Sequence, residues 1–130
     1  MKHTKTAPAW AVELTKQVCK DYNRATPKML RWYNGSNEFS SGFTYYDGSS
    51  VFVRAGTHGL DQELVLLHEL AHHLVSKTGK GRKQGHSIKF WRLAFELYDK
   101  YKVDLDYAIY REGEYRAKAI WAYEELMAKK

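Results

Sequence analysis

Residues 66–79, LLHELAHHLVSKTG, place three histidines and a glutamate within six positions of an otherwise apolar run. His68 and His72 are four residues apart, so on a helix their imidazoles project from one face. Glu69 lies about 100° round the same helix and can reach a group held between the two rings. This H-E-x-x-H spacing is typical of helices that bind Zn²⁺ through two neutral imidazoles, while the glutamate takes a proton from metal-bound water.

The residues around this motif predict a helix over residues 60–77. Asp61 is the expected N-cap of that helix, and Gly79 is the expected residue at which it stops. The face opposite the two histidines would anchor the helix in the core, and it carries Leu64, Leu67, Ala71 and Leu74. A rigid, buried helix of this kind is a suitable platform for a metal site.

Further apolar patterns predict helices on both sides of this segment. Residues 10–24 repeat apolar side chains at helical spacing, and so do residues 87–102. The chain from Asp106 onwards is rich in alanine, glutamate and tyrosine and is expected to be helical, with Gly113 as a weak point.

Strand-forming residues fill the region between the first two expected helices. Residues 28–33 have the composition of a strand and are followed by the turn residues Asn34 and Gly35. Residues 43–46 and 51–54 are two further β-rich runs, and Asp47 and Gly48 between them predict a tight hairpin. The second of these runs, together with the residues up to Gly56, is either an edge that pairs with an extended peptide or an ordinary sheet strand.

The composition agrees with one α+β domain. The chain has 130 residues, of which 44% are hydrophobic and 28% are charged, as in ordinary globular proteins. We expect a flexible tail at residues 1–9 and a single domain at residues 10–130, which is zincin-like in that its H-E-x-x-H motif resembles that of the zincins. This domain would hold an N-terminal helix, a small and mostly antiparallel sheet, the H-E-x-x-H helix, a following helix and a C-terminal helix.

Charge and cysteine content bear on partners and compartment. The formal charge of +6 favours anionic partners, and the partner expected from it is DNA, contacted weakly through a basic surface. A single cysteine, Cys19, excludes an intrachain disulfide and a cysteine zinc cluster, which indicates a reducing compartment. The first ten residues lack the apolar core of a signal peptide, and no apolar run reaches the length of a membrane span. We therefore expect a cytoplasmic protein without membrane contact.

A catalytic zinc site needs a third protein ligand in addition to His68 and His72. A metzincin would have glycine and histidine where this chain has Val75 and Thr78, so that arrangement is excluded. His86 is the preferred third ligand, because the glycines that precede it allow the chain to turn back after the helix. Glu96 on the next helix is the alternative.

A hydrolase also needs a group that stabilises the oxyanion. Tyr45, Tyr46, His73 and Tyr107 are the candidates for this role or for supporting the ligands. His73 directly follows His72, so it points about 100° away from the ligand face.

The sequence HELAHHL followed by GHSIKFW resembles the SprT-like and WLM-type zinc metallopeptidases. It is most similar to small bacterial and phage metallohydrolases whose motif reads HELAH, then a loop, then HGPEF. The match covers about residues 42–97, and Phe90 keeps the spacing of the last motif. Ser87 stands where that motif has glycine, and Ile88 and Lys89 stand where it has proline and glutamate.

The resemblance implies that His68, His72 and His86 bind one Zn²⁺ and that Glu69 is the general base. The expected function is that of a zinc metallopeptidase with protein or peptide substrates. Two alternatives stay open. One is a basic nucleic-acid-associated binding module, and the other is a metal-stabilised protein without catalysis, in which Glu96 would close the coordination sphere.

Overall fold

The structure is a computed structural model that describes residues 4–33, 42–45, 49–54, 59–75, 86–113 and 117–130. The chain divides into two compact units, Met1–Lys83 and Gln84–Lys130. Within the described residues it is an α+β protein with five helices and one small mixed sheet. The expected turns at Asn34 and Gly35 and at Asp47 and Gly48, and the expected helix stop at Gly79, lie outside the described residues.

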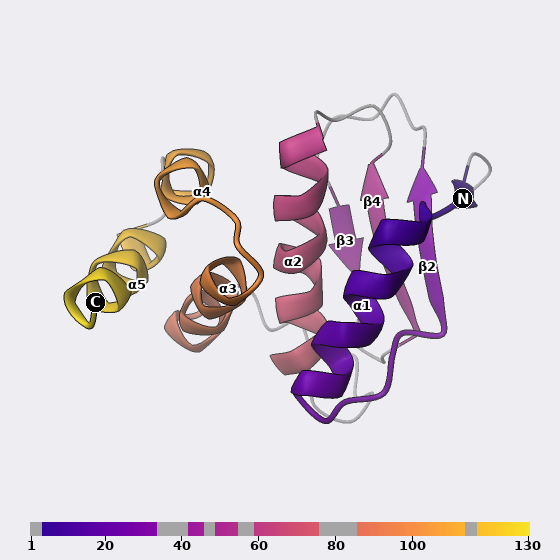
Figure 1. The fold of residues 1–130 in the computed structure, drawn as a ribbon, viewed down its shortest axis with the longest axis horizontal. Coiled ribbons are helices and arrows are strands. Elements are labelled where there is room, and N and C mark those ends of the chain that lie inside the picture. The colour runs from indigo at the N-terminus through magenta and orange to yellow at the C-terminus, as the bar shows by residue number, and fades with distance from the viewer. Residues whose placement is uncertain (1–3, 34–41, 46–48, 55–58, 76–85, 114–116) are drawn as a thin grey trace. The chain divides into compact units, whose positions relative to one another are not determined.

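The sheet belongs to the first unit and has the strand order β1-β2-β4-β3 (Figure 1). Its strands are β1 (Thr4–Thr6), β2 (Met29–Tyr33), β3 (Gly42–Thr44) and β4 (Ser50–Arg54). The β3–β4 and β1–β2 pairs are antiparallel, which agrees with the expected hairpin and with a mostly antiparallel sheet. The β2–β4 pair is parallel, with Leu30 opposite Val51 and Trp32 opposite Val53.

The first residues of the chain correct one expectation. The flexible tail at residues 1–9 is wrong for Thr4–Thr6, because these residues pair with Arg31–Tyr33 as strand β1. Main-chain hydrogen bonds to β2 hold this short edge strand. A three-residue polar segment held by main-chain bonds has no hydrophobic pattern, so this strand could not be predicted from the sequence.

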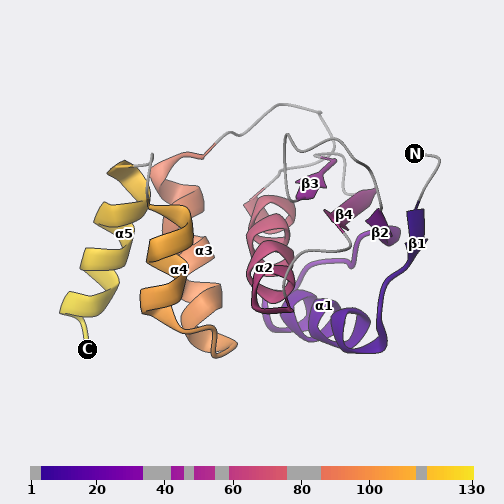
Figure 2. The ribbon, with the colours of Figure 1, turned by 90° about the horizontal axis from the view of Figure 1, so that it is seen from above.

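Two helices cover one face of the sheet (Figure 2). They are α1 (Ala9–Asp21) and α2 (Gly59–Val75). α2 packs against β3 and β4, α1 packs against α2, and together these contacts exclude water from the core of this unit. Side chains with no more than 1% exposure in this core are Ala11, Val18, Cys19, Val51, Val53, Leu66, Leu67, Leu70 and Ala71.

Helix α2 agrees with the expected helix to within two residues at each end. It begins at Gly59, so Asp61 lies inside the helix and is not its N-cap. The burial of Leu64, Leu67 and Ala71 confirms the expected core-facing side.

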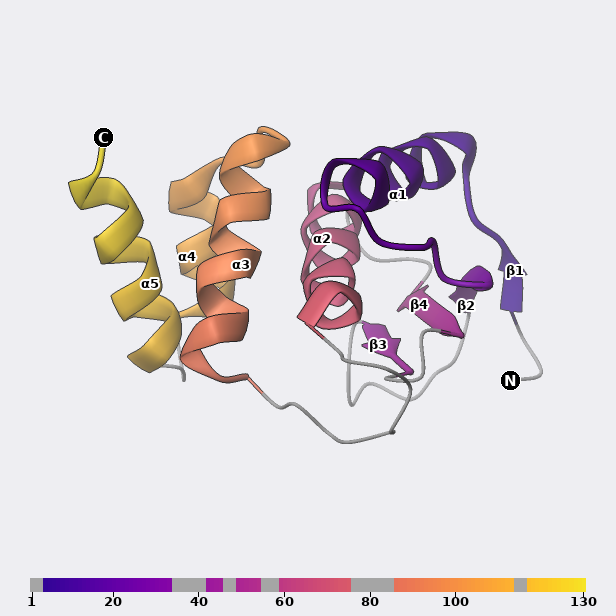
Figure 3. The same cartoon turned by 90° about the horizontal axis from the view of Figure 1, so that it is seen from below.

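The second unit is made of α3 (Ile88–Lys100), α4 (Leu105–Glu112) and α5 (Ala117–Ala128), which pack side by side (Figure 3). Phe90, Trp91, Phe95 and Tyr98 of α3 are almost completely buried. The expected C-terminal helix is thus two helices, and the first ends at Glu112 with Gly113, the expected weak point, as its C-cap. Among the described residues, no helix is long and apolar enough to cross a membrane.

Candidate metal centre

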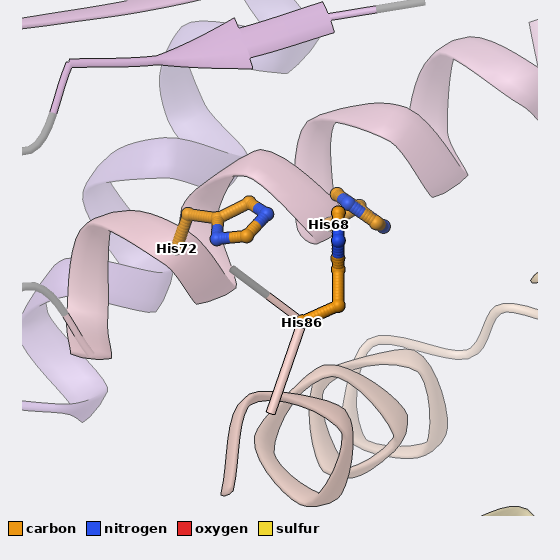
Figure 4. A group of neighbouring side chains, drawn as sticks. All are labelled: His68, His72 and His86. Atoms are coloured by element: carbon orange, nitrogen blue, oxygen red, sulfur yellow. The ribbon is translucent and has the colours of Figure 1, made fainter. Parts of the chain in front are cut away.

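His68 and His72 project from the same side of α2, as their spacing predicts (Figure 4). Their ring centroids are 5.1 Å apart, and the rings are inclined at 65° to each other. His72 is 5% exposed, whereas His68 is half-buried. Two imidazoles at this separation on a rigid helix are suited to sharing one metal ion.

Glu69 is a buried carboxylate at the contact between α2 and β3. It is 5% exposed, and its Oε1 accepts a hydrogen bond of 2.6 Å from the Thr44 hydroxyl. The same hydroxyl lies 3.0 Å from the main-chain oxygen of Glu69. A buried charged group needs such a partner, because burial removes its hydration.

His73 faces away from the other two histidines of the motif and has a structural contact. It is 2% exposed, and its Nε2 lies 2.8 Å from the main-chain oxygen of Ala25. Because a carbonyl oxygen only accepts, the ring donates from Nε2. Burial lowers the pKa of His73, and this effect outweighs the opposing hydrogen bond to Ala25. A neutral His73 therefore links the end of α2 to the segment that follows α1.

His86 lies two residues before the start of α3, in the second unit (Figure 4). Its ring stacks on Trp91 at 5.4 Å and 24° and meets Phe90 edge-on at 5.1 Å. Ser87 is the N-cap of α3 and accepts a hydrogen bond of 3.2 Å from the main-chain N–H of Phe90. Capping and stacking thus fix the imidazole relative to the helix that follows it.

The remaining candidate residues have more ordinary surroundings. Tyr45 is 49% exposed and packs beside Phe52 in the first unit. Tyr107 is a half-buried residue of α4 whose ring lies 6.5 Å from that of Tyr110. Glu96 is exposed on α3. Tyr46 lies outside the described residues.

The strand after the hairpin has its two edges occupied. Residues 50–54 form β4, which pairs with β2 on one side and β3 on the other. Of the two alternatives for this strand, the structure favours an ordinary sheet strand, because β4 has no edge left to offer a peptide.

Sequence reasoning missed two residues that contact the candidate side chains. Thr44 is a single threonine at the end of a three-residue strand, and its contact with Glu69 spans 25 positions of the chain. Trp91 lies on the apolar face of α3, where its packing against His86 cannot be told from ordinary core packing. A local signal existed only for Ser87, because a serine directly before an apolar repeat is typical of a helix N-cap.

No protein-family model matches this chain, and neither the curated proteins nor the solved structures contain a match to it.

Proposed function

We propose that this protein is a zinc-dependent hydrolase, and specifically a metallopeptidase of the zincin type, which its motifs resemble. The observation that carries the proposal is a pair of histidines and a buried glutamate on one rigid helix. His86 would be the third ligand. His68 and His72 supply two imidazoles from one side of α2, and His86 completes the three-histidine set that the resemblance implies.

The donor set fits Zn²⁺. Neutral imidazoles are borderline-soft nitrogen donors, and three protein ligands leave one coordination position open. Glu96, the alternative third ligand, is an exposed residue of α3.

Zinc with an open position would polarise a substrate carbonyl and make a water molecule more acidic. Glu69 would accept the proton of the attacking water and pass it on to the leaving amine. Its burial beside Thr44 supports this role, because a fixed base in a dry site transfers protons without first having to reorient. Protein or peptide substrates are the expected class.

The metal assignment is tested by metal analysis of the purified protein. We expect about one zinc per chain, with most of it lost in His72→Ala and in His86→Ala. Glu96→Ala is the matched control and should keep the metal. Full zinc in His86→Ala together with loss in Glu96→Ala would show that the third ligand is the glutamate.

The general base is tested with Glu69→Gln, which keeps the size of the side chain but cannot take a proton. The variant should retain zinc and lose at least about a hundredfold in kcat on fluorescent casein or quenched peptides. Unchanged turnover would remove Glu69 from the mechanism.

We also infer a cytoplasmic location. Cys19 is a buried free thiol, and burial raises its pKa to about 11. An unpaired thiol agrees with a reducing compartment.

A further inference from the structure

Thr44 holds the carboxylate of Glu69 from the neighbouring strand. Its Oγ1 lies 2.6 Å from Oε1 and 3.0 Å from the main-chain oxygen of the same glutamate. A hydroxyl has one proton and can donate to only one of these oxygens at a time. The shorter distance is typical of a hydroxyl donating to a carboxylate, so the stronger bond is the one to the side chain.

Gly42 confines the stem of the same glutamate. A Cβ atom at position 42 would lie 3.0 Å from Cγ of Glu69, 2.7 Å from the main-chain oxygen of Phe52 and 2.8 Å from Cγ1 of Val65. The backbone of β3 therefore approaches α2 closely at the position of Glu69. Gly42 makes room for the stem of the side chain, and Thr44 binds its end.

These two contacts restrict a side chain that otherwise has many rotamers. A glutamate on a helix surface must be ordered before it can meet a proton donor at hydrogen-bond distance. Fixing Oε1 also fixes the region that Oε2 can occupy, because both oxygens belong to one planar group. The contacts thus order Glu69 before any substrate binds.

We propose that Thr44 is a positioning residue, which holds the Glu69 carboxylate in the orientation required for proton transfer. This inference rests on the proposed function, since it assigns a task to the same base. It adds a residue of the sheet to the histidines and the glutamate that α2 carries.

The test compares Thr44→Val, which has a similar shape but no hydroxyl, with Thr44→Ser, which keeps the hydroxyl. Thr15→Val is the matched control, because Thr15 is also a buried threonine of the first unit but lies on α1. Each zinc-loaded full-length variant is assayed for zinc content, kcat and KM on fluorescent casein and quenched peptides. Glu69→Gln and the Thr44→Val/Glu69→Gln double variant are assayed beside them.

We expect Thr44→Val to keep its zinc and its KM while kcat falls about tenfold to a hundredfold. Thr44→Ser should keep most of the parental kcat. Thr15→Val should match the parent protein in zinc content, kcat and KM. Thr44→Val should cause no further loss of kcat in the Glu69→Gln background, because the group that it positions is then already absent.

Two different failures can be told apart. Parental kcat in Thr44→Val together with an inactive Glu69→Gln overturns the positioning role and leaves the proposed function standing. Parental kcat in Glu69→Gln, or no hydrolysis by the parent protein, overturns both. In the first case, melting temperatures are compared for the parent protein, Thr44→Val, Glu69→Gln and the double variant. Non-additive shifts would then show that the contact between Thr44 and Glu69 contributes to stability alone.

Discussion

Thr15 and Thr44 are both buried threonines, but their hydroxyl groups have different surroundings. Among the described residues, the Thr15 hydroxyl on α1 has no hydrogen-bond partner, whereas the Thr44 hydroxyl binds Glu69. Burying an unsatisfied hydroxyl costs about 1–3 kcal/mol. We expect Thr15→Val to raise the free energy of unfolding by about 1 kcal/mol, because valine fills the same space and has a similar helix propensity. Urea denaturation measures this change, and a clear loss of stability would show that the hydroxyl is bonded.

His73 makes the stability of the first unit dependent on pH. Burial lowers its pKa from the ordinary value of 6.5, so the folded protein binds the proton less tightly than the unfolded chain. The unfolded chain therefore takes up more protons as the pH falls through 6.5. The stabilisation is complete above that value, decreases below it, and stops decreasing once the pH has passed the lowered pKa of the folded state.

The measurement is the free energy of unfolding at pH 7.5 and 5.5 in the presence of EDTA, so that metal binding does not contribute. His73→Gln keeps an N–H donor for the main-chain oxygen of Ala25 but does not titrate. We expect the parent protein to lose more stability on acidification than this variant. Equal slopes for the two proteins would show that His73 is not the titrating group.

At the scale of elements, the contact between β3 and α2 depends on a glycine. An added Cβ at position 42 would meet the main-chain oxygen of Phe52 at 2.7 Å, and a backbone atom cannot move aside as a flexible side chain can. We expect Gly42→Ala to lower the free energy of unfolding by about 1–3 kcal/mol, as overpacking does. It should also lower kcat, because the strand that carries Thr44 is displaced. Urea denaturation and the peptide assay measure both effects, and parental values in both would refute this account of the contact.

The helices that the sequence predicts well are those with long apolar repeats. α1, α2 and α3 bury one face each, and that periodicity is readable over more than three turns. The sheet was predictable only where pairing is local, as in the β3–β4 hairpin. The β1–β2 and β2–β4 pairs join distant segments, and no local pattern encodes their register.

In the candidate site too, only the local part could be predicted. The relative positions of His68, Glu69 and His72 were predictable because one helix sets their spacing, and the two histidine rings lie close together on α2. The role of Thr44 depends on which strand packs against α2 and was not readable. The role of His73 could not be predicted either, because its partner is the main-chain oxygen of Ala25, 48 positions away in the chain.

At the scale of the whole molecule, the proposed ligands come from both compact units. His68 and His72 belong to Met1–Lys83, and His86 belongs to Gln84–Lys130. A metal bound by all three would link the two units, and the stability of each would then depend on the other. The single domain expected over residues 10–130 stays a prediction, and a shared metal would make the two units unfold as one.

Hydrogen exchange followed by mass spectrometry tests the linkage directly. With free zinc at about 100 times its Kd, binding to the folded state adds about 2.7 kcal/mol, which slows exchange through global opening about a hundredfold. In the parent protein we expect this protection in peptides from both α2 and α3. In His86→Ala the protection should be confined to α2 and be weaker there, because two imidazoles remain as ligands. Glu96→Ala, which removes an exposed carboxylate of α3, should behave as the parent. Zinc-dependent protection of α3 that survives in His86→Ala would mean that the metal does not reach the second unit through this histidine.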